Sequence, residues 1–163
     1  MAGRDPGWGL RGPGTQPEDV RVLLQGTQTL PDGMAGDTVT EAEGTLRRLG
    51  DAWHILFAEA GEEGRGGTKT HIALREHSVE VHKRGDVEVD FLFREGEQTR
   101  AEYRTDCGGI PMGILTRKLQ VRETGTGLMA ELGYELSAGE GPGIDCRILI
   151  EADKIVNGKR KAT

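Results

Sequence analysis

Hydrophobic residues recur at every second position along most of the chain between residues 20 and 150. Five segments show this period clearly, because one parity is apolar while the other carries polar or charged side chains. Their apolar members are Val20, Val22 and Leu24; Val79 and Val81; Val87, Val89, Phe91 and Phe93; Leu128, Ala130, Leu132, Tyr134 and Leu136; and Ile144, Cys146, Ile148 and Ile150. A strand points successive side chains to opposite faces, so the alternation predicts half-buried antiparallel strands.

Turn-forming residues stand between the strand-like segments. The turn signals are Pro31-Asp32-Gly33, Gly50-Asp51, Arg84-Gly85-Asp86, Glu95-Gly96-Glu97, Gly125-Thr126-Gly127 and the run from Gly139 to Gly143. Glycine supplies 26 residues, and many of them fall in these turns, where positive φ angles are wanted. Short strands separated so regularly predict an all-β sandwich or a closed barrel.

One segment, between residues 40 and 60, fits two different structures. As a helix, it keeps apolar residues at helical spacing from Leu46 to Ala60, and Thr40 with Glu43 resembles a capping box. As a hairpin, it forms one strand over residues 39–49 and another over 52–60, with a turn at Gly50-Asp51. The inward residues of the second strand would be Trp53, Ile55 and Phe57. The local pattern leaves both structures open.

The stretch from Tyr103 to Arg117, YRTDCGGIPMGILTR, reads as a strand interrupted by two glycines and a proline. Glycines relieve crowding at a sharp bend and proline fits an edge or a bulge, so we interpret the interruption as a barrel corner. A contact with a ligand at a barrel mouth is the alternative. Two inward sets are open beyond the glycines: Leu115, Leu119 and Val121, or Ile110, Met112 and Ile114 followed by a bulge that shifts the register.

A chain of 163 residues is long enough for one domain with its own core. Its formal net charge is -6, from 27 acidic and 21 basic residues. This charge disfavours nucleic acid as a partner, because a phosphate backbone needs a dense basic face. No apolar run approaches the roughly 18 residues that span a bilayer, and no secretory signal precedes the first strand. We therefore expect a cytoplasmic protein without a membrane partner.

The two ends differ in composition from the middle. Residues 1–17 are rich in glycine and proline, so we expect a disordered extension that cannot bury enough surface to become ordered. Residues 18–153 form the expected barrel domain, and residues 154–163 are expected to be a flexible basic tail. Cys107 and Cys146 are too few for a disulfide framework. Cys146 reads as a core residue, whereas the reactivity of Cys107 is left open.

The order of several short motifs is similar to that of a known family. The motifs are Gly67-Thr68-Lys69-Thr70, the turn Arg84-Gly85, Tyr103-Arg104-Thr105 with Gly108, a strand with Met112 and Thr116, and Tyr134-Glu135-Leu136. This succession resembles the YwiB-like family of small bacterial proteins. Order and spacing carry the resemblance, since no single motif is specific.

The resemblance implies an all-β fold, an antiparallel up-and-down calycin-like (lipocalin-like) β-barrel of about 8–10 strands. It also implies that the disputed segment is a hairpin, in which Phe57-Ala58-Glu59 matches an aromatic residue followed by an acid. The chain departs from the family by this phenylalanine in place of the usual tyrosine, by its Gly-Pro-rich start and by its basic end. The resemblance implies no activity, so function has to be argued from residues.

A barrel of about eight strands can hold one small ligand, and inward polar side chains among apolar ones would mark the site. Six residues are candidates for such contacts: Glu59, Thr70, Arg84, Tyr103, Thr105 and Thr116. Arg84, at a turn, could clamp a carboxylate or a phosphate with its planar fork. Ordinary roles at a strand end or in a packed core fit each of the six as well.

Metal and cofactor chemistry find little support in the sequence. The four histidines, His54, His71, His77 and His82, do not have the short spacing of a zinc site, so no metal is expected. The sequence contains no Ser-His-Asp order, no Gly-rich phosphate loop before a helix and no CxxC motif. Hydrolase, NTPase and redox functions therefore have no positive signal, and no cofactor is expected.

Three functions remain as hypotheses. The first is a non-catalytic barrel that binds a small, partly apolar ligand, with an aromatic lining of Trp53, Phe57, Phe91, Phe93 and Tyr103. The second is a protein-interaction module with a dry core, which presents a barrel face or an edge strand to a partner such as a second copy in a homodimer. The third and least favoured is an enzyme that uses Glu59 or Tyr103 as a general acid or base.

Overall fold

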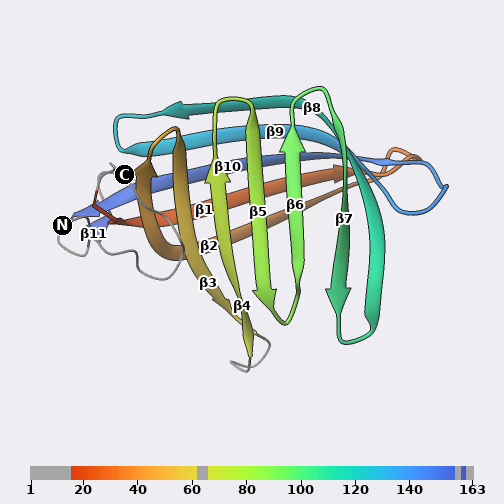
Figure 1. Ribbon diagram of the computed structural model, residues 1–163, viewed down its shortest axis with the longest axis horizontal. Coiled ribbons are helices and arrows are strands. Elements are labelled where there is room, and N and C mark those ends of the chain that lie inside the picture. The colour runs from red at the N-terminus through yellow and green to blue at the C-terminus, as the bar shows by residue number, and fades with distance from the viewer. Residues whose placement is uncertain (1–15, 62–65, 157–158, 161–163) are drawn as a thin grey trace.

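The structure is a computed structural model that describes residues 16–61, 66–156 and 159–160. These residues form antiparallel strands and no helix (Figure 1). The strands are β1 (Glu18–Thr29), β2 (Ala35–Leu49), β3 (Ala52–Ala60), β4 (Gly67–Leu74), β5 (Ser78–Gly85), β6 (Val89–Arg94), β7 (Gln98–Thr105), β8 (Gly108–Glu123), β9 (Gly127–Ser137), β10 (Ile144–Val156) and the short β11 (Lys159–Arg160). The all-β class predicted from the alternating pattern is confirmed.

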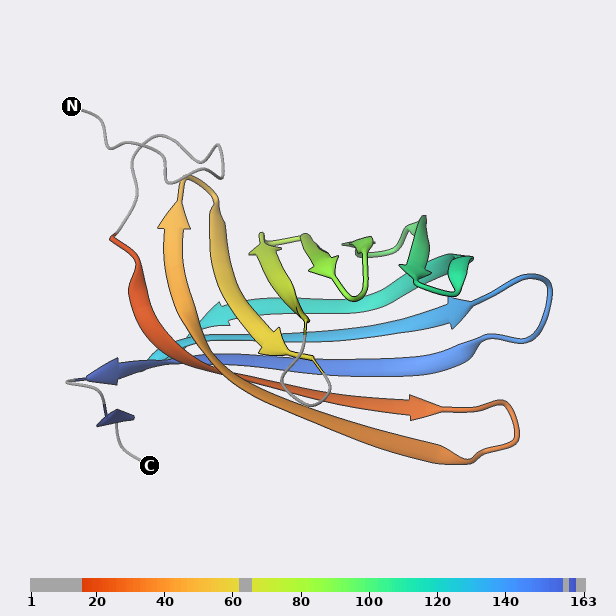
Figure 2. The ribbon, with the colours of Figure 1, turned by 90° about the horizontal axis from the view of Figure 1, so that it is seen from below.

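The strands form one sheet that wraps into a nearly closed barrel (Figures 1 and 2). Their order is β6-β5-β4-β3-β2-β1-β10-β9-β8-β7, so the first strand pairs with β10 and the two free edges belong to β6 and β7. One bridge joins these edges, between Glu88 and Arg104, through backbone hydrogen bonds of 3.0 and 2.9 Å. The barrel therefore closes between β6 and β7, two strands from the middle of the chain, and this incompletely paired junction is called the seam.

The disputed segment is the β2–β3 hairpin, and the helical interpretation is wrong. Residues 44–49 of β2 pair with residues 52–57 of β3, and Gly50 takes a φ of 61° in the turn. Gly44 is required where the strands meet, because a Cβ atom there would collide with the Leu56 carbonyl and with the Cβ of Phe57. The part of β2 that precedes Gly44, residues 35–43, bends away from β3. Among the described strands it pairs with β1 alone, and together they form a long arm (Figure 2).

The glycine-rich stretch after Tyr103 is a hairpin turn between β7 and β8, where a barrel corner was expected. Thr105 pairs with Gly108 across the turn, and Gly108 has a φ of 118° that favours glycine. Later in β8 the register shifts between Thr116 and Lys118. This bulge agrees with the second of the two alternatives, since Ile114 and Thr116 before it and Leu119 after it are all buried. Ile110, which belongs to the same predicted inward set, is 49% exposed near the hairpin turn, so that part of the prediction is wrong.

The core fills the inside of the barrel with the apolar parity of nearly every long strand. Its buried members are Val20, Val22, Leu46, Ile55, Phe57, Ile72, Leu74, Val79, Val81, Phe93, Ile114, Leu119, Leu128, Ala130, Leu132, Ile150 and Ala152. Burial of a side chain of this size contributes about 1.5–3 kcal/mol, so the enclosed face dominates the stability of the fold.

The two ends of the chain are described only in part. The disorder expected over residues 1–17 lies outside the described residues except for Gln16 and Pro17. In the expected basic tail, β10 runs on to Val156 and β11 pairs with it, while the remainder lies outside the described residues. Among the residues that the structure describes, no helix is long and apolar enough to cross a membrane.

Candidate functional site

Two of the six predicted contact residues lie inside the barrel. Thr70 is 2% exposed on β4 and Thr116 is 0% exposed on β8, and neither Oγ1 atom has a hydrogen-bond partner. Thr70 pairs with Phe57 and Thr116 pairs with Tyr134, so both hydroxyls sit among core side chains. Both threonines therefore point into the barrel, as their parity along the strands predicts.

The other four predicted residues lie around strand ends. Glu59 is half-buried near the end of β3, and Tyr103 is half-buried on β7 opposite Ile110. Arg84 is exposed and forms an ion pair with Asp90 at 2.9 Å, while the Oγ1 atom of Thr105 accepts a hydrogen bond from the Cys107 amide. Within the described chain, no hydrogen bond or ion pair joins any two of the six predicted residues.

The aromatic residues expected to line a cavity are mostly packed against other core side chains. Phe93 lies against the ring of Tyr134 at a centroid distance of 4.8 Å and against Phe91 at 5.9 Å. Burial raises the pKa of Tyr134, and the neighbouring Cys146 adds to the shift. Of the expected lining, Trp53 alone borders the hollow at the barrel mouth described next.

One mouth of the barrel holds a hollow of about 430 Å³ with an apolar floor and a charged rim. Trp53, Leu74 and Val121 form the floor, from β3, β4 and β8. The rim consists of Arg48, Asp51, Arg75, Glu76, Arg122 and Glu123. The volume is within the range of small-molecule sites, and barrel mouths are a common place for them. Most of the lining residues here are charged, and the apolar contribution is confined to the floor.

An ion pair spans this mouth from β2 to β8. The Nη1 atom of Arg48 lies 3.3 Å from Oε2 of Glu123, although the two residues are 75 positions apart and their strands are not neighbours in the sheet. Both residues follow the inward parity of their strands, Arg48 after Leu46 and Glu123 after Val121. The pair therefore closes the top of the hollow at the end of the buried core.

Arg48 is held in place by two further contacts. Its Nε atom donates a hydrogen bond of 3.2 Å to the Gly50 carbonyl, and its guanidinium lies 5.3 Å from the ring centre of Trp53. A guanidinium over an indole face is attracted by the ring quadrupole. Sequence reasoning missed both Arg48 and Glu123, although the parity they share with Leu46 and Val121 is visible in the sequence.

The remaining rim charges are unevenly paired. Arg75 contacts Asp51 at 3.4 Å and Glu80 at 3.2 Å. Arg122 reaches the sulfur of Met129 at 3.5 Å and has no carboxylate partner among the described residues. The rim therefore carries one cation, Arg122, whose charge no neighbouring carboxylate balances.

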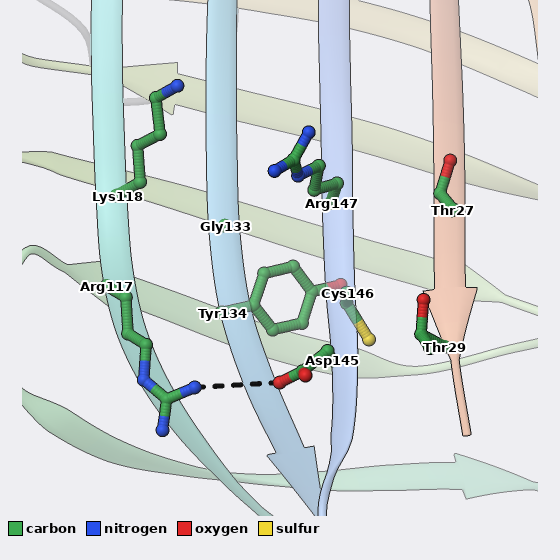
Figure 3. Close-up of a pocket in the computed structure, with 9 residues that line it drawn as sticks. All are labelled: Thr27, Thr29, Arg117, Lys118, Gly133, Tyr134, Asp145, Cys146 and Arg147. Atoms are coloured by element: carbon green, nitrogen blue, oxygen red, sulfur yellow. Dashed lines mark ion pairs between the residues drawn. The ribbon is translucent and has the colours of Figure 1, made fainter. Parts of the chain in front are cut away.

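A larger hollow of about 580 Å³, here called the outer hollow, lies on strands β1, β10, β9 and β8 and shares no lining residue with the mouth (Figure 3). The bulge in β8 makes both Arg117 and Lys118 exposed, and Gly133 leaves the sheet bare between Lys118 and Arg147. Arg117 contacts Glu135 at 2.9 Å and Asp145 at 3.5 Å, the second of which is drawn in Figure 3. Tyr134 and Cys146 supply the apolar part of its lining.

Three of the histidines form a row across β3, β4 and β5. The Nδ1 atom of His54 lies 2.9 Å from Nε2 of His71, and the rings of His71 and His82 are 5.6 Å apart. Burial, followed by the neighbouring His54 and His82, lowers the pKa of His71 to about 4. Burial is also the largest cause that lowers the pKa of His54. No group of three or more His, Cys, Asp or Glu in the described chain is arranged to hold a metal ion.

The fold and the filled interior define this protein as a small, nearly closed antiparallel β-barrel. The chain belongs to the family described as a domain of unknown function (DUF1934), whose model matches residues 22–150. Its fold is similar to that of the crystal structure of the ywiB protein from Bacillus subtilis, with a TM-score of 0.68 and 17% identity. That match covers 86% of this chain and 96% of the other, and it confirms the YwiB-like resemblance. No curated protein matches the chain.

Proposed function

We propose that this protein is a non-catalytic barrel that binds one small, partly apolar molecule at the mouth between β2, β4 and β8. The observation that carries the proposal is the apolar floor of Trp53, Leu74 and Val121 inside a ring of charged side chains. Such a floor removes the apolar part of a ligand from water, and the rim fixes its orientation.

The mouth is favoured over the interior and over the outer hollow for two physical reasons. The interior is filled by core side chains, and displacing them would create strain that typically costs about 1–3 kcal/mol. The outer hollow also has an apolar lining, from Tyr134 and Cys146, but its cation Arg117 is already held by two carboxylates, those of Glu135 and Asp145. A binding function is favoured over catalysis, because no nucleophile next to a base lies in the mouth.

Nuclear magnetic resonance tests the proposal through the indole of Trp53. In a Trp8→Phe background, Trp53 gives the one indole N–H signal of the protein. Titration with the uncharged aromatic probe 2-naphthol should shift that signal in a saturable way. Val121→Arg, which places a long cation on the floor, should weaken the binding of 2-naphthol about tenfold or more, about 1.4 kcal/mol.

The matched control is Thr27→Arg, which makes the same change of charge and size in the outer hollow. This variant should leave the titration of the Trp53 signal unchanged. A Trp53 signal that does not move, or a probe response that follows Thr27→Arg and ignores Val121→Arg, would exclude the mouth as the binding site.

Self-association is a second candidate function, favoured by the free edge of β2. Residues 35–43 of β2 pair with β1 on one side and with no described strand on the other, and Val39 there is 65% exposed. Unpaired strand edges are templates for another strand. The exposed carboxylates of Asp37 and Glu41 would repel those of a second copy, so this candidate ranks behind ligand binding. Sedimentation over a range of protein concentrations, with Val39→Lys as the comparison, tests it.

A further inference from the structure

We infer that the ligand of the mouth carries a carboxylate, which takes the place of the Glu123 carboxylate on Arg48. The inference rests on the proposed function and adds the chemical class of the ligand. In this arrangement Glu123 is an internal competitor, supplied by the end of β8, and Arg48 is the residue that selects an anion.

The position of the Glu123 carboxylate shows where a ligand carboxylate would sit. Glu123 reaches the guanidinium that lies over Trp53, so a carboxylate in its place would stand directly beside the apolar floor. A ligand bound there would contact Trp53 and Val121 with its apolar part and Arg48 with its charge. Both requirements are met by one aromatic or aliphatic carboxylate.

The ion pair is weak enough for a ligand to displace it. The Arg48 and Glu123 side chains are 43% and 61% exposed, and their closest contact is a single one of 3.3 Å. Exposed ion pairs typically contribute 0–1 kcal/mol, because water screens the charges and the side chains lose freedom. A ligand carboxylate that also buries its apolar part on Trp53 would add the hydrophobic contribution that Glu123 lacks.

Arg48 is better prepared for an incoming carboxylate than the other rim cations. Its hydrogen bond to the Gly50 carbonyl and its position over Trp53 fix the guanidinium before a ligand arrives. Arg75 already contacts two carboxylates, those of Asp51 and Glu80. Arg122, which has no carboxylate partner in the described chain, adds a second positive charge to the same rim. A side chain that is already ordered before binding loses less conformational entropy when the ligand arrives, so less of the binding free energy is spent on ordering it.

The test compares two probes that differ only in charge, naphthalene-2-carboxylate and naphthalene-2-carboxamide. Their binding to the full chain is measured by the Trp53 indole signal in the Trp8→Phe background. The carboxylate should bind at least tenfold more tightly than the amide. Glu123→Gln should tighten binding of the carboxylate severalfold and leave the amide unchanged, because the Glu123 carboxylate then no longer competes for the Arg48 guanidinium. Arg48→Gln should remove the difference between the probes.

Glu76→Gln is the matched control, since it removes one negative charge from the same rim at a residue that does not contact Arg48. It should change the affinity for the carboxylate less than twofold. Equal tightening by Glu76→Gln and Glu123→Gln would overturn the inference, because general charge and not displacement would then set the affinity.

The possible outcomes distinguish failure of the carboxylate inference from failure of the proposed ligand binding at the mouth. Binding of both probes with equal affinity, unchanged by Glu123→Gln and Arg48→Gln, overturns the carboxylate inference and leaves a ligand-binding mouth. Binding of neither probe overturns both. A thermal unfolding curve for each variant shows whether it is folded, and Glu123→Gln alone decides the inference if Arg48→Gln does not fold.

Discussion

Single residues of this barrel illustrate the difference between an inward position and a binding role. Thr70 and Thr116 share the parity of the core, and the structure buries both of them as the sequence indicates. Their hydroxyls have no hydrogen-bond partner, and each is surrounded by packed side chains. A buried hydroxyl without a partner costs free energy relative to an apolar group of the same shape. The parity of a residue along its strand predicts whether its side chain points inward, but it does not predict a hydrogen-bond partner for a buried hydroxyl.

Thr116→Val should therefore stabilise the protein. The substitution keeps the shape of the side chain and removes an Oγ1 atom that has no partner, so we expect the free energy of unfolding to rise by about 1 kcal/mol. Urea unfolding followed by circular dichroism measures the change. Thr27→Val, on the exposed outer side of β1, should have an effect near zero. A clear loss of stability in Thr116→Val would mean that the hydroxyl is satisfied in solution.

His71 should make the stability of the fold depend on pH. The folded protein favours the neutral ring, with a pKa of about 4 against 6.5 for an unperturbed histidine. The unfolded chain therefore takes up the proton first, and stability is lost as the pH falls from 6.5 to 4, with no further loss from this group below 4. Because solvent screens a half-buried ring, we expect about 1–2 kcal/mol from this group.

Urea midpoints at pH 7.5, 6.5, 5.5 and 4.5 measure this dependence, with His71→Gln as the variant that should flatten it. His77→Gln is the control, because His77 lies exposed in the turn between β4 and β5. An equal flattening in both variants would show that the slope does not come from the histidine row.

At the scale of elements, the β2–β3 hairpin shows how tertiary pairing decides between two local patterns. Residues 40–60 have both helical and alternating apolar spacing, so local propensity is not decisive. In the barrel each half finds a neighbour, β1 for β2 and β4 for β3, which a helix at this place would leave unpaired. The family resemblance predicts the hairpin where the local pattern does not, because it rests on the order of motifs along the whole chain.

Gly44→Ala should test the geometry of this hairpin. A methyl group at Gly44 would meet the Leu56 carbonyl and the Phe57 Cβ, so β2 and β3 would have to move apart. We expect a loss of about 1–3 kcal/mol in the free energy of unfolding, which is typical of overpacking. Gly36→Ala on the same strand is the control, since a Cβ there meets nothing within 4 Å. Similar unfolding midpoints for the two variants would contradict the close approach at Gly44.

At the scale of the whole molecule, the barrel is least complete at the seam between β6 and β7. The bridge between Glu88 and Arg104 closes one end, and the Thr99 hydroxyl donates a hydrogen bond to the Leu92 carbonyl across the gap. At the other end, the Gly96 amide in the β6–β7 turn donates to the Thr116 carbonyl at 2.8 Å. No continuous ladder of backbone hydrogen bonds joins β6 to β7 among the described residues.

We therefore expect the seam to open before the rest of the barrel. Backbone amides of residues 89–93 and 98–103 that face the seam should exchange with deuterium faster than those of β9 and β10, which pair on both sides. Hydrogen exchange at neutral pH measures the difference. Thr99→Val removes the side-chain hydrogen bond from Thr99 to the Leu92 carbonyl across the gap and should raise exchange at the seam further. Equal protection of β6, β7 and β9 would show that the seam is not a weak point.

In the five clearly alternating segments the strand positions and the inward faces follow from the sequence alone, because a strand alternates its faces within a few residues and glycine-rich turns mark where it ends. For the bulge at Arg117 the sequence offers two alternatives, since the bulge depends on how β8 pairs with β9. Arg48 and Glu123 meet only in the folded barrel, because strand order and register bring together two strand ends that are 75 positions apart. The sequence determined which side of the sheet each residue takes, and only the tertiary structure decided which residues share a mouth, since closure is a property of the whole sheet.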